Sequence, residues 1–384
     1  MSEMSQRRLG MIGSFIDLQR DWSGVPLGII GGLRELGVET EYVDATPARL
    51  GRPVYRWLSA VGQARNGWQL RPEMVSIGRL SGAIRRHRPR PDIAGWIHVR
   101  CLPVGRPAPG RYVTFEDITV AQIQRYDREH GFSPRRWARW NAAQADLYRH
   151  AHACCTVSTW SKASLVADYG VPEEKIHLVG LGRNVDFEAP PDRDWSTPRF
   201  LFVGRDWDRK NGEAVVRAFR RLRQDIPAAR LDLVGHHPPM EGEGVVGHGH
   251  LSHADPEEQR TLLALYREAT CFVMPSHAEA FAIAYLEAAT AGMPVIATTN
   301  SGIGDALGAD GALYVDPEDD AGLYRAMLHL CEPDIAASMG SAARRNASPF
   351  TWARVARGIL GALELDGSEE SSIAPVTAER PADA

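Results

Sequence analysis

Short apolar runs alternate with amphipathic stretches through the second half of this 384-residue chain. The apolar runs are typical of strands buried on both faces, and the stretches between them have the spacing of helices. The predicted strands are RFLFVG (199–204), ARLDLVG (229–235), CFVMPS (271–276), PVIATT (294–299) and ALYVD (312–316), and the predicted helices cover 211–222, 255–269, 280–292 and 319–331. This alternation predicts βαβ units, and therefore an α/β fold with a parallel sheet covered by helices on both faces.

The first half shows the same alternation less clearly. It contains predicted strands at 8–15, 39–45, 93–99, 111–117 and 153–159, and predicted helices at 26–37 and 135–151. The stretch 181–198 is rich in Pro, Asp and Gly and has no period, which is typical of an interdomain linker. We therefore expect an N-terminal domain (1–190), a C-terminal domain (199–348), a last helix (349–365) and a disordered tail (366–384).

Composition narrows the class of protein. Hydrophobic residues make up 44% of the chain, which is enough for two cores. A net charge of −4 argues against a general nucleic-acid binder. The five cysteines include no CxxC pair, and no apolar run has the roughly 20 residues of a membrane helix or the pattern of a signal peptide. We expect a cytoplasmic protein, and the strong preference for arginine suggests a bacterial one.

Two cations follow the predicted strand 199–204. In FVGRDWDRKNG (202–212), Arg205 and Lys210 stand in a turn that leads into a helix. Such a turn can hold phosphate oxygens, because the free N–H groups and the dipole of the helix N-terminus add to the side-chain charges. A surface turn with two solvated charges is the alternative. Lysine occurs at only three positions, 162, 175 and 210, so its retention here favours a site that needs a compact charge.

Two glutamates, Glu279 and Glu287, stand eight positions apart after the predicted strand 271–276. Glu279 falls at the carboxyl edge of the predicted sheet, where ligands bind in open parallel sheets, and Glu287 falls in the following helix. Carboxylates at this edge can accept hydrogen bonds from the hydroxyls of a ribose and a neighbouring sugar. Taken singly, each glutamate is more often a structural or solvated residue.

Four segments together resemble the retaining glycosyltransferases of family 4, the group 1 glycosyltransferases. They are TVSTWSKASLVADYGVPEEKIHLVGLGRNVD (156–186), FVGRDWDRKNG (202–212), LVG (233–235) and LYREATCFVMPSHAEAFAIAYLEAATAGMPVIAT (265–298). The Arg-x4-Lys turn and the Glu-x7-Glu element occur in the order and at the separations of that family. The resemblance extends over about 155–350 and is weak before it.

The resemblance implies a GT-B fold: two facing Rossmann-like domains with parallel sheets, and a C-terminal helix that crosses back to the N-terminal domain. It implies a nucleoside diphosphate sugar as donor, UDP- or GDP-linked, no metal or other cofactor, and a small-molecule or glycan acceptor. Arg205 and Lys210 would hold the diphosphate, Glu279 the donor sugar and Glu287 the ribose. The remaining donor-site residues would be Gly24, in DWSGVP (21–26), and Ala280, Phe281 and Ala282, with alanine at 280 and 282 where the family usually has glycine.

Two further residues are candidates for catalysis. Many relatives have a histidine in the segment that corresponds to YVTFEDIT (112–119), where this chain has Glu116. His98 is a candidate for supplying an imidazole in its place, although a lone histidine at a strand end is more often structural. The histidines of GHGHLSH (247–253) suggest a metal site only weakly, and the basic run 84–91 is typical of a solvated loop. The alternative functions are a catalytically silent nucleotide-sugar-binding subunit, a sugar-nucleotide epimerase and a phosphorylase.

Overall fold

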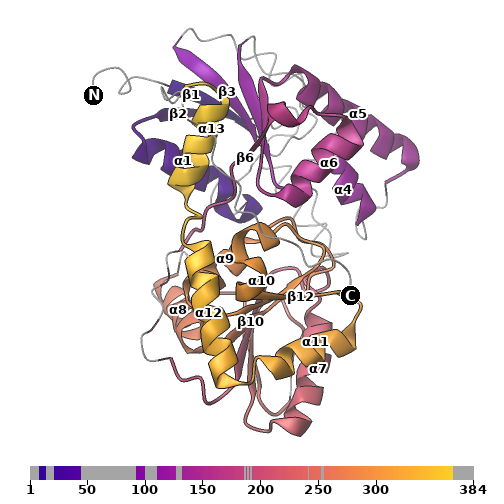
Figure 1. The fold of residues 1–384 in the computed structure, drawn as a ribbon, viewed down its shortest axis with the longest axis vertical. Helices are drawn as coiled ribbons and strands as arrows, with labels where there is room; N and C mark the ends of the chain where they lie inside the picture. Colours follow the sequence, from indigo (N-terminus) through magenta and orange to yellow (C-terminus); the bar gives the residue numbers. More distant parts are fainter. Residues whose placement is uncertain are drawn as a thin grey trace. The chain divides into compact units, whose positions relative to one another are not determined.

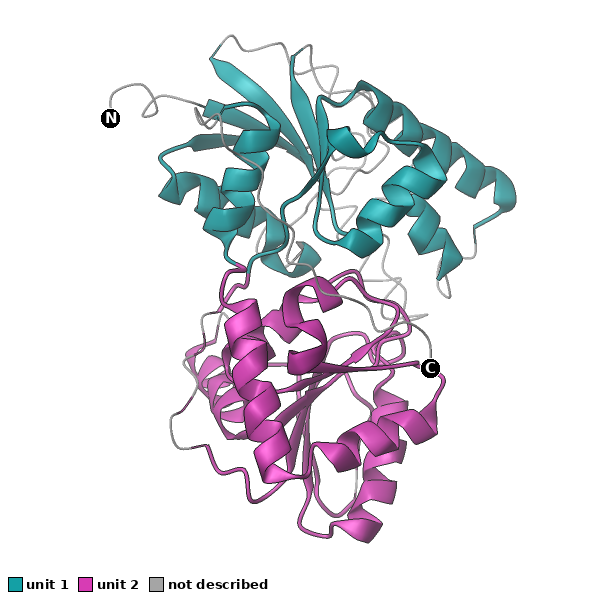
Figure 2. Ribbon diagram, viewed as in Figure 1, with its two compact units in different colours: residues 1–182, 351–374 teal, residues 183–350, 375–384 magenta. Residues whose placement is uncertain are grey.

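The structure is a computed structural model, and it forms two compact units (Figures 1 and 2). It describes residues 8–13, 21–44, 92–99, 110–126, 132–185, 187, 190, 193–240, 242–251 and 255–365. Unit 1 comprises residues 1–182 and 351–374, and unit 2 comprises residues 183–350 and 375–384. The predicted disordered tail (366–384) and the basic run 84–91 lie outside the described residues.

Unit 1 contains a six-stranded parallel sheet. Its strand order is β2 (Glu39–Asp44), β1 (Arg8–Gly13), β3 (Ile93–Val99), β4 (Tyr112–Glu116), β5 (Ala153–Thr156) and β6 (Ile176–Leu178). Its described helices are α1 (Val25–Glu35), α4 (Val120–Arg125), α5 (Pro134–His150), α6 (Thr159–Tyr169) and α13 (Trp352–Ala362), with short 3₁₀ turns at Asp21–Gly24 and Glu173–Lys175. The predicted strands of the first half therefore all form and share one sheet.

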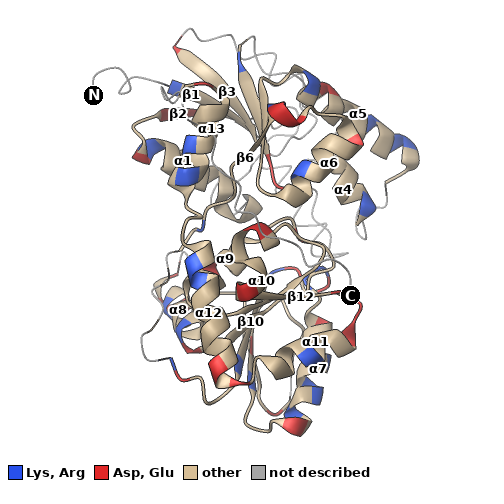
Figure 3. Cartoon of the chain, in the orientation of Figure 1, with Lys and Arg blue, Asp and Glu red and all other residues tan. Residues whose placement is uncertain are grey.

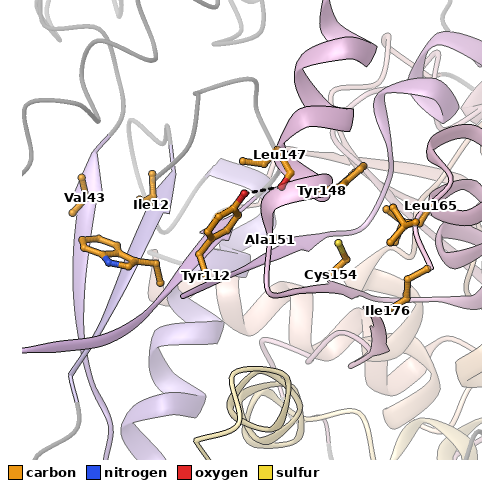
Figure 4. Close-up of a cluster of buried hydrophobic side chains, with 11 residues drawn as sticks. Ile12, Val43, Tyr112, Leu147, Tyr148, Ala151, Cys154, Leu165 and Ile176 are labelled. Carbon is orange, nitrogen blue, oxygen red and sulfur yellow. Dashed lines mark hydrogen bonds between the residues drawn. The ribbon is translucent and has the colours of Figure 1, made fainter. Parts of the chain in front are cut away.

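One face of this sheet packs on the helices that follow β4 and β5 (Figure 4). Leu147 and Tyr148 of α5 and Leu165 of α6 are buried there against the apolar side chains of the strands. The Tyr112 hydroxyl donates to the carbonyl oxygen of Leu147 at 2.7 Å, which satisfies a polar group inside the core. This packing holds the carboxyl ends of the strands in place.

Unit 2 contains a second six-stranded parallel sheet. Its strand order is β12 (Ala312–Val315), β11 (Val295–Thr298), β10 (Cys271–Val273), β7 (Arg199–Gly204), β8 (Arg230–Gly235) and β9 (Val245–Gly249). Its helices are α7 (Gly212–Asp225), α8 (Pro256–Glu268), α9 (Ile283–Thr290), α10 (Gly304–Gly311), α11 (Asp320–His329) and α12 (Pro333–Ala347). The five predicted strands and four predicted helices of this half all form.

The last helix, α13, belongs to unit 1 although it follows the whole of unit 2 in the sequence (Figure 1). It packs beside α1, where the Trp352 side chain lies against Gly28. A Cβ atom added at Gly28 would lie 2.1 Å from the Trp352 ring, and one at Gly182 would lie 2.4 Å from it. The predicted return of the C-terminal helix to the N-terminal domain is confirmed.

None of the helices in the described ranges combines the length and the apolar character that a membrane-spanning segment requires.

Candidate active site

The winding of the unit 2 sheet reverses at β7. This strand lies between β8 and β10. The chain continues from β7 to β8 on one side, and from β10 to β11 on the other side. Ligands of open parallel sheets bind outside the carboxyl ends of the strands at such a point. The loops that follow β7 and β10 therefore form the expected ligand-binding edge of unit 2.

The turn after β7 carries the predicted phosphate-binding cations. Arg205 is exposed and has no ion-pair partner among the described residues. Asn211, just before α7, adopts a left-handed conformation with φ of 60°. Gly204 pairs with Gly235 of β8, and a Cβ atom at Gly235 would lie 1.8 Å from the Gly204 carbonyl oxygen. The close approach of the two backbones requires glycine at position 235, at the carboxyl edge of β8.

The turn after β7 contacts the loop after β10 through three charged side chains. Lys210 Nζ donates to Glu279 Oε2, and Arg209 Nη1 donates to the same oxygen at 3.0 Å. The Lys210 and Glu279 side chains are each only 12% exposed. Arginine residues also occur in α5 and α7 (Figure 3), so it is the low exposure of Lys210 and Glu279 that distinguishes this cluster.

Glu279 is held in its ionised form. Burial by itself would raise the pKa of this carboxyl group, but Lys210 and Arg209 outweigh burial and lower the pKa to about 2. Burial also lowers the pKa of Lys210, and Glu279 opposes that shift. At neutral pH Glu279 is thus a hydrogen-bond acceptor rather than a general acid.

The loop from Glu279 to α9 is tight and partly strained. Glu279 N donates to the carbonyl oxygen of Asn300 at 3.1 Å, so this segment runs alongside the end of β11. Ala282 has a positive φ of 53°, at one of the two positions where the resembling family usually has glycine. Ala280 is 6% exposed, and Phe281 is fully buried beside Phe350.

Glu287 lies inside α9 and is only 7% exposed. Burial raises the pKa of this carboxyl group to about 8, although the backbone N–H groups of Val185 and Asn184 donate to it and oppose the shift. Glu287 therefore does not share the environment of Glu279, and the structure brings Glu279 rather than Glu287 together with the cations. Its predicted contact with ribose stays a prediction.

Comparisons with known proteins give the family. The model of the family described as "Glycosyl transferases group 1" matches residues 197–333. The chain is 31% identical to a glycogen synthase of Mycobacterium tuberculosis over 328 residues, which is 80% of this chain and 74% of that protein. The chain belongs to the group 1 glycosyltransferases.

Other relatives of this group 1 glycosyltransferase match it over less of their length. A D-inositol 3-phosphate glycosyltransferase of Acidothermus cellulolyticus is 28% identical over 57% of this chain, and the match spans 54% of that protein. The solved structure of a sucrose-phosphate synthase from Thermosynechococcus elongatus superposes with a TM-score of 0.66 at 18% identity, covering 93% of this chain and 98% of that one. The predicted GT-B architecture, with two Rossmann-like parallel sheets, is confirmed.

The other predicted residues of this group 1 glycosyltransferase lie in unit 1. Gly24 precedes α1 with φ of 76°, the last of three consecutive left-handed residues that begin at Trp22. Trp22 Nε1 donates to Asp117 Oδ2 at 2.8 Å, so this turn reaches the residue that follows β4. Gly24 thus lies at the carboxyl edge of the unit 1 sheet, and its predicted contact with the donor stays a prediction.

Glu116 and His98 lie in the strands of that sheet. Glu116 is 1% exposed and accepts a hydrogen bond from Gln144 Nε2 at 3.1 Å. His98 is fully buried, and neither of its ring nitrogens has a hydrogen-bond partner in the described part of the chain. Burial lowers the pKa of His98 to about 4, so the imidazole is neutral at physiological pH. The catalytic roles predicted for both residues stay predictions.

The histidine-rich segment does not form a metal centre within the described residues. No group of three or more potential metal ligands occurs there, and His253 is not described. His248 lies in β9 and pairs with Asp232 at 2.7 Å. His237 accepts a hydrogen bond from Gly249 N at 3.0 Å. These contacts attach the edge strand to β8.

Sequence reasoning missed Arg209, which stands next to Lys210 and reaches the same carboxylate. It also missed Asp206, which binds Arg209. One signal was present in the sequence, since three cations occur within six residues of a turn at a predicted ligand edge. The pattern does not show which of them would face Glu279.

Proposed function

We propose that this chain is a metal-independent, retaining glycosyltransferase that moves a sugar from a nucleoside diphosphate sugar to an acceptor hydroxyl. One observation carries the proposal: cations in the turn after β7 contact an ionised, largely buried carboxylate from the loop after β10, at the switch point of the unit 2 sheet. Its family membership and the similarity to enzymes named as glycosyltransferases support the same reading.

The residues suit the two halves of such a donor. Arg205 and Lys210 place positive charge where the diphosphate would lie, and the N-terminus of α7 lies beside them. Glu279 would accept hydrogen bonds from hydroxyls of the donor sugar. Fixed cations of this kind stabilise charge that develops in the transition state, and losing one typically costs about 10²–10³ in rate.

The proposed transfer needs no nucleophile from the protein. The bond between the anomeric carbon and the diphosphate oxygen breaks, and the diphosphate keeps the electron pair. The acceptor oxygen bonds to the anomeric carbon on the same face, and its proton passes to the departing phosphate oxygen. Arg205 and Lys210 would stabilise the diphosphate charge as it forms. Glu279 would hold the sugar while its ring becomes oxocarbenium-like.

Thermal unfolding with UDP, GDP, ADP and TDP tests the proposal. A nucleotide at about 100 times its dissociation constant adds about 2.7 kcal/mol of stability, which raises Tm by several degrees. We expect one nucleotide to stabilise the wild type and Lys210→Ala to lose most of that shift. Arg217→Ala is the matched control, since Arg217 lies in α7 and pairs with exposed Asp320 at 2.9 Å. If no nucleotide raises Tm, the donor assignments are wrong.

Measuring the release of nucleoside diphosphate distinguishes an enzyme from a catalytically silent binding subunit. With the matching sugar nucleotide and no acceptor, an enzyme of this kind hydrolyses its donor slowly, and wild type should release nucleoside diphosphate. A protein that binds the nucleotide but releases none with any donor or acceptor tested would be the silent subunit instead.

A further inference from the structure

Arg209 connects the two loops of the candidate site. Its Nη1 donates to the carbonyl oxygen of Ala278 at 3.1 Å and to Glu279 Oε2 at 3.0 Å. Its own carbonyl oxygen accepts from His277 N at 3.0 Å. The residue is therefore bonded through both its backbone and its side chain to the segment that carries Glu279.

The guanidinium of Arg209 is also held from the other side. Asp206 Oδ2 accepts from Arg209 Nε at 3.2 Å, and Asp206 Oδ1 accepts from Arg209 N at the same distance. Asp206 lies in the turn after β7, so the planar guanidinium bridges a carboxylate in one loop and a carboxylate in the other. A rigid fork of donors can do this, whereas the single ammonium of a lysine cannot.

One carboxylate oxygen of Glu279 thus has two cationic partners with different attachments. The Arg209 side chain makes three hydrogen bonds and its backbone two more, whereas the Lys210 side chain donates to Glu279 alone among the described residues. Lys210 can therefore turn toward a diphosphate while Arg209 keeps Glu279 in place. Burial disfavours the charge of Arg209, but Glu279 and Asp206 raise its pKa and keep it protonated.

We propose that Arg209 is a positioning residue for the donor sugar: it fixes the Glu279 carboxylate and leaves Lys210 available to the diphosphate. The inference rests on the proposed function and deepens it. Arg209 would contact neither the sugar nor the phosphates and would act through Glu279. Its removal should therefore weaken recognition of the sugar, and it should leave recognition of the bare nucleotide intact.

Titration calorimetry and donor-hydrolysis kinetics on Arg209→Gln test this. The probes are the nucleotide selected from UDP, GDP, ADP and TDP, and its glucose or mannose conjugate. We expect the Kd of the bare nucleotide to change less than about twofold. We expect kcat for donor hydrolysis to fall about 10- to 100-fold, the usual effect of a misplaced reacting geometry. Arg209→Lys should recover only part of the loss, because it keeps the charge without the fork.

A double-mutant cycle with Glu279→Gln decides between positioning and a general loss of folding. If Arg209 acts through Glu279, Arg209→Gln should have little further effect on kcat in the Glu279→Gln background. Equal losses in both backgrounds would overturn the proposal, as would weaker binding of the bare nucleotide, which would make Arg209 a phosphate ligand. Failure of wild type to bind any nucleotide would instead overturn the proposed function itself.

Discussion

The two glutamates of the Glu-x7-Glu element have different surroundings in the fold, and their pKa values shift in opposite directions. Glu279 lies between two cations and has a pKa of about 2, whereas Glu287 is buried in α9 with a pKa of about 8. A cation near a carboxylate favours its ionised form, and burial without one favours the neutral form. Two glutamates of one sequence motif therefore differ in the charge that they carry near neutral pH.

Glu287 should make stability depend on pH. Its pKa is raised on folding, so the stability it contributes is complete below its unfolded pKa of about 4.3 and is lost as the pH rises through about 8. Between pH 6 and 8, wild type should lose about 2 kcal/mol that Glu287→Gln, which cannot ionise, retains. Urea unfolding of both proteins at pH 6, 7 and 8 measures the difference. Parallel pH dependence would contradict it.

The site was only partly predictable at the level of single residues. Glu279 and the two predicted cations could be placed at one sheet edge because parallel strands end together. Arg209 and Lys210 reach the same carboxylate oxygen because of the path of the turn from Arg205 to Asn211. In this turn Asn211, which is not a glycine, has a left-handed φ of 60°. No periodicity in the sequence reports such a path.

Among the elements, the sequence predicted best the strands and helices whose apolar residues follow a clear pattern. The strands β7, β8 and β11 are short and largely apolar, and the pattern predicted each of them to within a residue or two. β9 was missed because VVGHG (245–249) has only two apolar side chains, followed by glycine, histidine and glycine, and lies at the sheet edge. α10 was missed because GDALGADG (304–311) contains three glycines and has a kink at Gly308.

The contact between α1 and α13 predicts opposite effects for two neighbouring glycines. A Cβ atom at Gly32 would lie 2.2 Å from the Trp352 carbonyl oxygen, whereas one at Gly31 would have no heavy atom within 4 Å. Gly32→Ala should destabilise the protein by about 1–3 kcal/mol through overpacking. Gly31→Ala should stabilise it by about 0.5–1 kcal/mol through helix propensity. Differential scanning calorimetry of both variants measures this, and equal effects would show that α13 does not pack as described.

Arg193 joins the C-terminal ends of two helices in unit 2. Its buried guanidinium donates to the carbonyl oxygens of Tyr266 and Ala269 at the end of α8, and of Ala291 at the end of α9. These carbonyls have no partner within their helices, and the helix dipole favours a cation there. Burial lowers the pKa of Arg193 to about 10, so the side chain remains charged at neutral pH.

Arg193→Leu should therefore cost about 3 kcal/mol, since it leaves several buried carbonyl groups without a donor. Arg199→Leu is the control, because the exposed pair of Arg199 with Glu268 should contribute less than about 1 kcal/mol. Urea unfolding followed by circular dichroism compares the two variants. A loss for Arg193→Leu no larger than that of the control would contradict the capping role.

At the scale of the whole molecule, the described part of the chain crosses between the units after Gly182 and again after Phe350. On the unit 2 side of both crossings, Arg183 Nη1 donates to the carbonyl oxygens of Ser348 and Phe350, each at 3.0 Å. The two crossing segments are thus joined by hydrogen bonds. Each unit has its own sheet and its own buried core, which is the usual condition for separate cooperative unfolding.

The two units should therefore respond independently to substitutions in their cores. In calorimetry, Gly32→Ala should lower the transition of unit 1 alone and Arg193→Leu that of unit 2 alone, because each contact lies within one unit. The double variant should show the sum of the two effects to within about 0.5 kcal/mol, as expected of distant sites. The nucleotide that binds the wild type should raise only the transition that Arg193→Leu lowers. A single transition that moves with either substitution would instead show that the units unfold together.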